Sequence, residues 1–329
     1  MKLLSNQRIS AEVFLRAIAV SLVVFNHSHP VTPIKLSGGL TMLLMLSGYA
    51  FARFALQTPD PARVRKSILG FAWKLFLPSM AIVLLSFAAK REFDWRELLF
   101  ISNWFGEKHI AMFFVWYPQV ILQILAVLFV FFAIPGLGST FLKRPLTGSL
   151  VALVGTMALK QVCDPHFDVA IYNGRLPILQ GWNFILGMAL FFALKTPAVS
   201  TRWWARALIP AAVIALVYVM WGPLLLKFWT LSFAVIFMAL LPVLKMPGLI
   251  ARPFFIVGEA SFAVFLLHLL IIQVVGALHI HDQNLVFLLA LAGSVGIWVA
   301  VTSLMRGYRR LRRAASADQG LVQVELGAA

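Results

Sequence analysis

Long apolar segments follow one another along almost the whole chain, and this pattern constrains the fold more than any other feature. A helix needs about 20 mostly apolar residues to span the hydrocarbon core of a bilayer. Segments of this kind lie at 11–29, 36–56, 68–89, 112–134, 147–163, 179–194, 205–222, 226–245, 254–278 and 283–304. The sequence therefore predicts an all-α polytopic membrane protein with about ten transmembrane helices and no separate soluble domain. We expect residues 1–305 to form one transmembrane domain and residues 306–329 a basic cytoplasmic C-terminal tail.

Composition agrees with lipid as the solvent. Of the 329 residues, 61% are hydrophobic and 12% are charged, whereas a soluble domain usually carries about 25% charged residues. A formal charge of +16 would point to nucleic acid in a soluble protein, but the basic residues here lie in short segments between apolar runs. We expect no nucleic-acid partner. The single cysteine, Cys163, excludes an internal disulfide and a site of several thiolates, and we expect no metal site.

The lysines and arginines predict the orientation of the chain. If the N-terminus is cytoplasmic, 18 of the 28 basic residues fall in cytoplasmic segments and seven in outer segments. Short cytoplasmic loops of membrane proteins carry an excess of Lys and Arg. The pattern favours a multi-pass protein with both termini in the cytoplasm.

Two ionisable residues lie in the first apolar segment. Arg16 and His27 are eleven residues apart, which is almost three helical turns, so they share one helix face about 16 Å apart along the axis. Ionisable groups at membrane depth are costly and commonly functional, and we expect both side chains to face one hydrated pocket. The alternative stays open that Glu12 neutralises Arg16 one turn away and that His27 caps the segment in the headgroup region.

Further polar residues interrupt the later apolar segments. Small residues such as Gly38, Gly39 and Ser47 permit close helix packing, although a Gly-Gly pair at the level of His27 would also leave space for a ligand. Lys74 stands in an apolar run shortly before Pro78, and Ser261 and His268 lie two turns apart on one stripe. The remaining polar residues that we expect to line a cavity or to bond a neighbouring helix are Tyr117, Gln119 and Gln123.

Four motifs occur in order along the chain. They are Arg16 followed after ten residues by His27, Gly38-Gly39 through Ser47-Gly48-Tyr49, the basic stretch from Arg63 to Lys74 and Pro78, and Gly258 through Ser261 to His268. Together they resemble the bacterial acyltransferase-3 family of integral membrane O-acyltransferases. The resemblance covers nearly the whole chain, and about ten spans agrees with it.

The resemblance implies transfer of an acyl group, usually acetyl, from cytoplasmic acyl-CoA to a hydroxyl, often of a surface glycan, at the bacterial cytoplasmic (inner) membrane. It gives His27 the catalytic position and Arg16 the place of its partner in an acyltransferase domain of residues 1–305. Imidazole titrates near working pH, so it suits a base for a hydroxyl. Whether His27 acts as the base or is itself acylated stays open.

The partners follow from the same resemblance. Basic residues around the third segment suit the phosphates of the coenzyme, and the donor-binding candidates are Arg53, Arg65 and Lys74. Acyl-CoA is then the donor substrate, no cofactor is tightly bound, and membrane lipid and a glycan or other hydroxyl acceptor are the remaining partners. Two other functions stay open. One is a transporter or flippase whose buried arginine and histidines line a permeation route, and the other is a non-catalytic scaffold.

Overall fold

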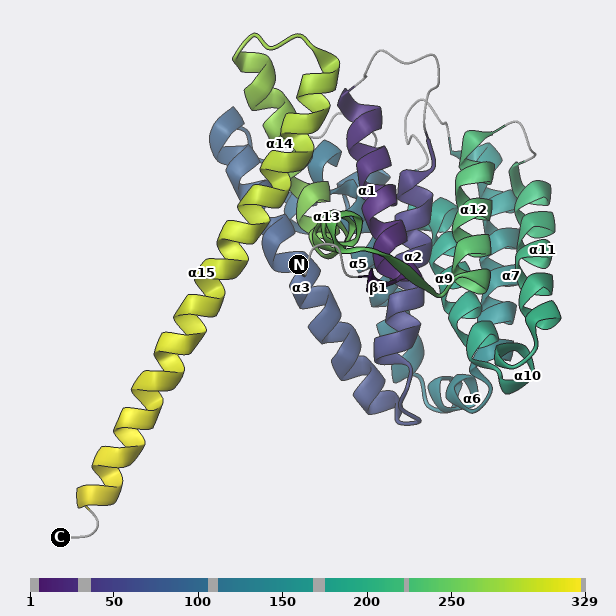
Figure 1. The fold of residues 1–329 in the computed structure, drawn as a ribbon. Helices are drawn as coiled ribbons and strands as arrows, with labels where there is room; N and C mark the ends of the chain where they lie inside the picture. The colour runs from purple at the N-terminus through teal and green to yellow at the C-terminus, as the bar shows by residue number, and fades with distance from the viewer. Residues whose placement is uncertain (1–5, 29–36, 106–111, 168–174, 222–224, 327–329) are drawn as a thin grey trace.

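The protein is a bundle of helices from which the last helix extends. The structure, a computed structural model, describes residues 6–28, 37–105, 112–167, 175–221 and 225–326. Most of the long helices lie side by side with roughly parallel or antiparallel axes (Figure 1). The last helix, α15 (Gln283–Leu326), begins in the bundle and its C-terminal part projects away from it. The predicted tail is therefore a continuation of this helix as far as Leu326.

The described elements are predominantly helical. The other long helices are α1 (Ala11–Ser28), α2 (Gly39–Ala55), α3 (Pro61–Lys90), α5 (Met112–Ala133), α7 (Pro145–Cys163), α9 (Pro177–Lys195), α11 (Trp203–Trp221), α12 (Leu226–Leu240), α13 (Gly248–Glu259) and α14 (Ser261–Ala277). Short helical turns are α4 (Trp95–Leu98), α6 (Leu137–Lys143), α10 (Pro197–Ser200), η1 (Ser102–Trp104) and η2 (Asp164–His166). Two strands, β1 (Asn6–Ser10) and β2 (Val243–Pro247), complete the fold.

Each of the ten apolar segments forms a helix or a pair of helices, but the predicted number of spans is only partly confirmed. Among the described residues, seven helices are long and apolar enough to cross a membrane, and the bent pair α13–α14 would be an eighth. The helices α2 and α12 have only 17 and 15 residues. A multi-pass membrane protein is thus well supported, whereas a count of ten spans is not.

The ninth segment is broken, contrary to the prediction of one continuous helix. The axes of α13 and α14 differ by 78°, and α13 is seen end-on in Figure 1, beside α1. Gly258 permits this crossing, because a β-carbon at that position would lie 2.3 Å from the backbone oxygen of Val13. Close backbone packing against α1 therefore decides the bend, which periodicity alone does not indicate.

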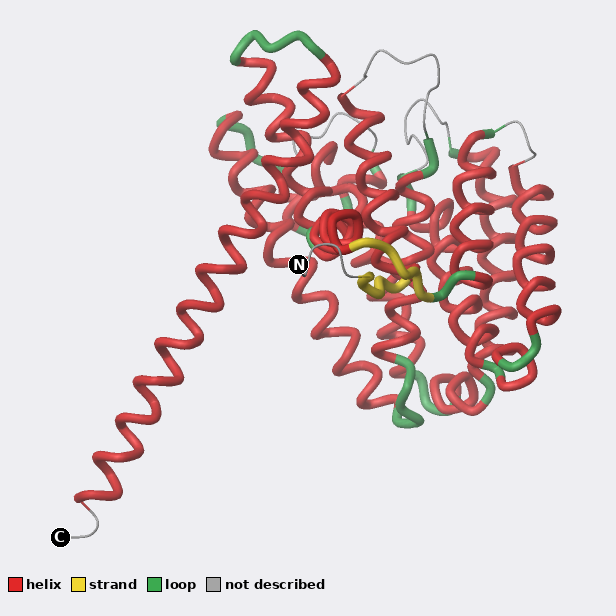
Figure 2. Tube along the Cα trace, in the orientation of Figure 1, coloured by secondary structure: helices red, strands yellow, loops and turns green. Residues whose placement is uncertain are grey.

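The eighth segment ends earlier than predicted. The helix α12 stops at Leu240, and the chain continues through Pro242 into β2, which pairs antiparallel with β1 in the register Asn6↔Pro247 (Figure 2). Proline disfavours continuation of a helix, because it lacks the amide hydrogen and its ring clashes with the preceding turn. The strand pair ties the start of α1 to the start of α13.

The helices α2 and α9 form the tightest crossing near the centre of the bundle. A β-carbon at Gly48 would lie 1.8 Å from the backbone oxygen of Phe184, and one at Gly187 would lie 1.8 Å from that of Met45. Such distances leave room only for hydrogen, so the two backbones meet directly. The predicted packing role of the small residues in the second segment is confirmed at Gly48.

Candidate functional site

Two cavities lie along α1. The first, here called the Arg16 cavity, has a volume of about 310 Å³, and its polar lining residues are Glu12, Arg16, Ser47, Lys74, Tyr117, Glu259 and Ser261. The second, here called the His27 cavity, has a volume of about 230 Å³ and is lined by Asn26, His27, Gly38, Gly39, Trp116 and Arg175 among others. Phe265 of α14 is the one residue that lines both cavities in the part of the chain that the structure describes.

Arg16 and His27 therefore do not share one pocket, and this prediction is wrong. They lie on one face of α1, as the helical spacing requires, but Phe265 separates the spaces into which they point. The ring of Phe265 packs against Tyr117 with a centroid distance of 4.7 Å. A helix remote in sequence supplies this partition, so the spacing within α1 does not predict it.

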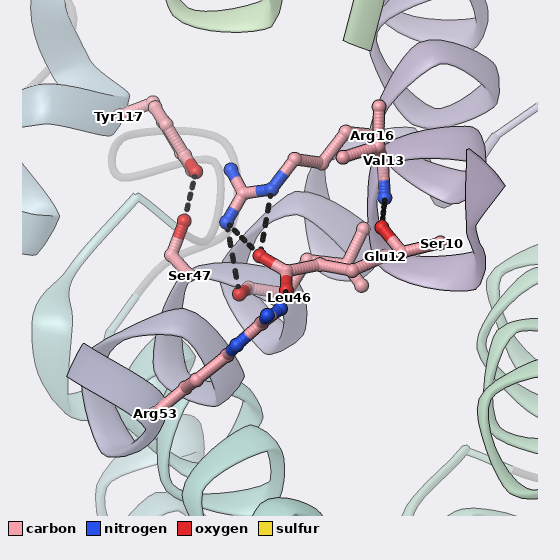
Figure 3. Close-up of polar contacts among 8 residues, drawn as sticks. All are labelled: Ser10, Glu12, Val13, Arg16, Leu46, Ser47, Arg53 and Tyr117. Atoms are coloured by element: carbon pink, nitrogen blue, oxygen red, sulfur yellow. Dashed lines mark hydrogen bonds and ion pairs between the residues drawn. The ribbon is translucent and has the colours of Figure 1, made fainter. Parts of the chain in front are cut away.

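Glu12 holds Arg16 in place. Arg16 donates from Nε and Nη2 to Glu12 Oε1 at 3.3 and 3.2 Å, and from Nη2 to the backbone oxygen of Leu46 at 3.1 Å (Figure 3). Arg53 of α2 donates to Glu12 Oε2 at 3.1 Å. One carboxylate thus bridges two guanidinium groups, and the sequence alternative that Glu12 partly neutralises Arg16 is confirmed.

Replacing Glu12 with alanine is expected to destabilise the protein. Glu12 is 8% exposed, so its loss leaves two like charges close together with no carboxylate between them. The expected cost lies between the ~1 kcal/mol of an exposed ion pair and the ~3–5 kcal/mol of breaking a fully buried one. Thermal unfolding in detergent measures it. Arg63→Ala removes the exposed ion pair of Arg63 with Asp60 but keeps the hydrogen bond by which Asp60 caps α3, so it serves as the control. Equal stability of the two variants would contradict the prediction.

The predicted donor-binding residues have three different positions. Lys74 lines the Arg16 cavity. Arg53 is joined to that cavity through Glu12, which both lines it and accepts the hydrogen bond of Arg53. Arg65 lies in the second turn of α3 and does not line either cavity in the described part of the chain. The Arg16 cavity thus brings together only part of the predicted cationic set.

Three of the remaining predicted residues line the Arg16 cavity. Ser47 Oγ and Tyr117 Oη form a buried hydrogen bond of 2.9 Å between α2 and α5. Ser261 is the first residue of α14, directly after the bend between α13 and α14, and it also lines this cavity. The polar lining of this cavity is therefore built from six helices, with α1 and α3 each supplying a cation.

A pair of histidines lies beside the His27 cavity. His27 Nδ1 is 3.1 Å from Nε2 of His268, which is fully buried on α14. His268 does not line either described cavity, and it is connected to the His27 cavity through its contact with His27. The sequence places both histidines in apolar segments, but it gives no sign that they touch, because 241 residues separate them.

The surroundings of His268 determine which ring nitrogens carry hydrogen. His268 Nδ1 is 2.7 Å from the carbonyl oxygen of Phe265 and 3.0 Å from that of Val264. Carbonyl oxygens only accept, so Nδ1 carries the hydrogen, and Nε2 of the neutral ring is an acceptor. His27 must then donate from Nδ1 to that acceptor. In neutral His27 the basic lone pair is consequently on Nε2.

Gly38 and Gly39 serve packing and also line the His27 cavity. Gly38 has φ +95° and lies against Thr230 and Lys227 of α12, while a β-carbon at Gly39 would lie 2.5 Å from the backbone oxygen of Ala19 in α1. The positive φ is strained for any residue with a side chain. The two glycines thus allow close helix packing and also leave space for a ligand, because the packed segment forms one wall of the cavity.

The glutamines of α5 do not line either described cavity. Gln119 Nε2 donates to Ser102 Oγ at 2.8 Å, and Gln123 Nε2 donates to the oxygen of Phe100 at 2.6 Å and to Asn103 Oδ1 at 2.8 Å. They hold the non-transmembrane segment that contains η1 against α5. The predicted bond to a neighbouring helix is thus replaced by bonds to a loop with one 3₁₀ turn.

The sequence does not indicate several residues that line the His27 cavity, among them Asn26, Trp116 and Arg175. Asn26 is adjacent to His27, and Trp116 is adjacent to Tyr117, so each lay beside a residue that was singled out. Arg175 lies between two apolar segments, where the sequence indicates only its contribution to membrane topology. No periodicity connects it to His27, because it precedes α9 and reaches the cavity through the tertiary fold.

Comparisons with known proteins give no further identification. No family model, no curated protein and no solved structure matches this chain.

Proposed function

We propose that this membrane protein is an O-acyltransferase that moves an acyl group, most simply acetyl, from acyl-CoA to a hydroxyl of a carbohydrate or lipid-linked glycan. The contact between His27 and His268 carries the proposal. It gives a membrane-embedded imidazole a defined tautomer and an open neighbouring cavity, and an imidazole so held is suited to accept a proton from a hydroxyl.

The chemistry needs two proton transfers, one to His27 and one from it, and the exchange of a C–S bond for a C–O bond. His27 Nε2 accepts the hydroxyl proton as the hydroxyl oxygen attacks the thioester carbonyl, and the C–S bond then breaks to release the coenzyme thiolate, which takes up the proton. During the attack His27 becomes positively charged. His268 Nε2 accepts from His27 Nδ1 and stabilises that charge, as the carboxylate does in a Ser-His-Asp triad. His268 is thus a positioning residue, since it touches neither substrate.

The orientation of the two cavities fits donor and acceptor on opposite sides. The distribution of basic residues favours a cytoplasmic N-terminus, so the Arg16 cavity would face the cytoplasm, where acyl-CoA is found. Lys74 and the Arg53–Glu12–Arg16 cluster there would bind its phosphates or carbonyl groups. The His27 cavity would then receive the acceptor from the outer side. The side chain of Phe265 has to move for the thioester to reach His27.

Transfer of an isotopically labelled acetyl group tests the proposal. Membranes with and without the protein receive acetyl-CoA with a ¹³C-labelled acetyl group, and mass spectrometry of glycans and lipids then locates the label. We expect a base-labile labelled ester only where the protein is present. The variant His281→Asn changes an exposed ring in the loop before α15 and is expected to behave like the unaltered protein. Unchanged acetyl-CoA and no labelled ester would reject the proposal.

A transporter is the second candidate, and the partition at Phe265 favours it. Two cavities separated by one side chain also suit a route that opens to each side in turn. This function predicts passage of a solute across vesicle membranes with no change in its mass. The same mass measurement therefore separates the two functions.

A further inference from the structure

The described lining of the His27 cavity includes one permanent cation, Arg175. Asn26 and Ser37 are uncharged polar groups, His27 is an imidazole, and none of the described lining residues carries a carboxylate. The Arg16 cavity differs, since Glu12 and Glu259 line it together with Arg16 and Lys74. Of these two cavities, only the His27 cavity combines a described cationic residue with no described carboxylate.

We propose that the His27 cavity binds an anionic sugar unit, with Arg175 binding its carboxylate or phosphate group. A guanidinium group matches the planar, two-oxygen geometry of these anions and binds them through paired hydrogen bonds. That the bound sugar is the acyl acceptor rests on the proposed function. Binding of the anion itself does not.

Neighbouring residues hold Arg175 in a fixed position. Arg175 is 6% exposed, and its backbone carbonyl oxygen accepts a hydrogen bond of 3.0 Å from Asn103 Nδ2. Asn103 is in turn bonded to Gln123 of α5 at 2.8 Å. The guanidinium group lies 5.6 Å from the ring centre of Trp116, which also lines the cavity. Its position is therefore set before a ligand arrives, and this reduces the entropic cost of binding.

The volume of the cavity limits the size of the ligand. At about 230 Å³ it lies below the roughly 300–1,000 Å³ that is typical of sites for drug-sized ligands. A single sugar unit fits this size better than an oligosaccharide. An anionic group at Arg175 would fix the orientation of the ring and thereby select which hydroxyl comes near His27.

Equilibrium binding to a variant that cannot turn over tests the proposal. Purified His27→Ala protein is titrated with methyl α-D-glucuronide, glucose 6-phosphate and methyl α-D-glucoside, which offer a carboxylate, a phosphate and no charge. We expect the charged probes to bind about tenfold to a hundredfold more tightly than the glucoside, as for one hydrogen-bonded charge pair. The ratio of the two charged probes distinguishes a carboxylate from a phosphate ligand.

Substitution of Arg175 locates the binding group. Arg175→Gln in the same background is expected to remove the preference for the charged probes and to leave glucoside binding unchanged. Arg175→Lys keeps the charge but loses the paired geometry, so an intermediate preference is expected. Arg202→Gln, an exposed residue outside the cavity, is the control. Equal binding of charged and neutral probes, no binding of either charged probe, or a preference that survives Arg175→Gln in folded protein overturns the proposal.

The result separates this proposal from the proposed function. If the charged probes bind through Arg175 and labelled acetyl transfer is absent, the anion site stands and the acyltransferase proposal fails. If acetyl transfer occurs and no preference for charge is found, the acyltransferase proposal stands and the anion site fails.

Discussion

Alanine in place of His27 is expected to lower acyl transfer about 10²- to 10⁴-fold, the usual contribution of general acid–base catalysis. The imidazole that lines the proposed acceptor site is then lost, while the helix keeps a residue that favours helical structure. His27 lies near the end of α1 and is partly exposed, so the variant is expected to fold and insert. The rate of labelled acetyl transfer, measured on an equal amount of purified folded protein, gives the result.

Variants of His268 refine this prediction. His268→Leu removes the acceptor of the hydrogen bond from His27 Nδ1, and the expected loss is about tenfold, the value of one hydrogen bond. His268→Gln offers an acceptor oxygen and is expected to recover part of that loss. His281→Ala changes an exposed histidine and is the control. Normal transfer by His27→Ala, or an identical loss in His268→Leu and His268→Gln, would contradict the proposed roles.

Alanine in place of Gly187 is expected to prevent stable folding. The added β-carbon would lie 1.8 Å from the backbone oxygen of Met45 and 2.7 Å from the backbone nitrogen of Tyr49. Overpacking a core typically costs ~1–3 kcal/mol when side chains can adjust. Here the contacted atoms belong to the backbone of α2, so a whole helix must move and the cost is expected to exceed that range. The yield of monodisperse protein in detergent and its unfolding temperature measure the effect.

Gly181 provides a matched control on the same helix. A β-carbon there would have no atom within 4 Å, and alanine is a better helix former than glycine by about 1 kcal/mol. Gly181→Ala is therefore expected to fold as well as the unaltered protein or better. If Gly187→Ala were equally stable, the backbone contact between α2 and α9 would not exist as described.

Several features of the candidate site followed from local sequence. The turn of the helix places Arg16 and His27 on one face of α1, and the one-turn spacing of Glu12 and Arg16 indicates their ion pair. Both properties depend only on residues within one helix. The same holds for Lys74, which the sequence singled out because a charge is costly in an apolar run.

Contacts between distant helices did not follow from the sequence. The contact of His27 with His268, the partition formed by Phe265 and the position of Arg175 each join segments far apart in the chain. A single sequence contains no signal for such pairs, since periodicity reports only which face of an element is apolar. The bend at Ala260 also did not follow from the sequence, because it depends on the packing of Gly258 against α1.

The sequence by itself determined that the chain is a helical, multi-pass membrane protein, because hydrocarbon requires long apolar helices whose backbone groups are bonded internally. It also determined which polar residues stand at membrane depth. Only the tertiary structure decided that these residues form two cavities instead of one, and which ring nitrogen of His27 is basic. The physical reason is that burial and spacing act along one helix, whereas hydrogen bonds and partitions depend on which helices pack together.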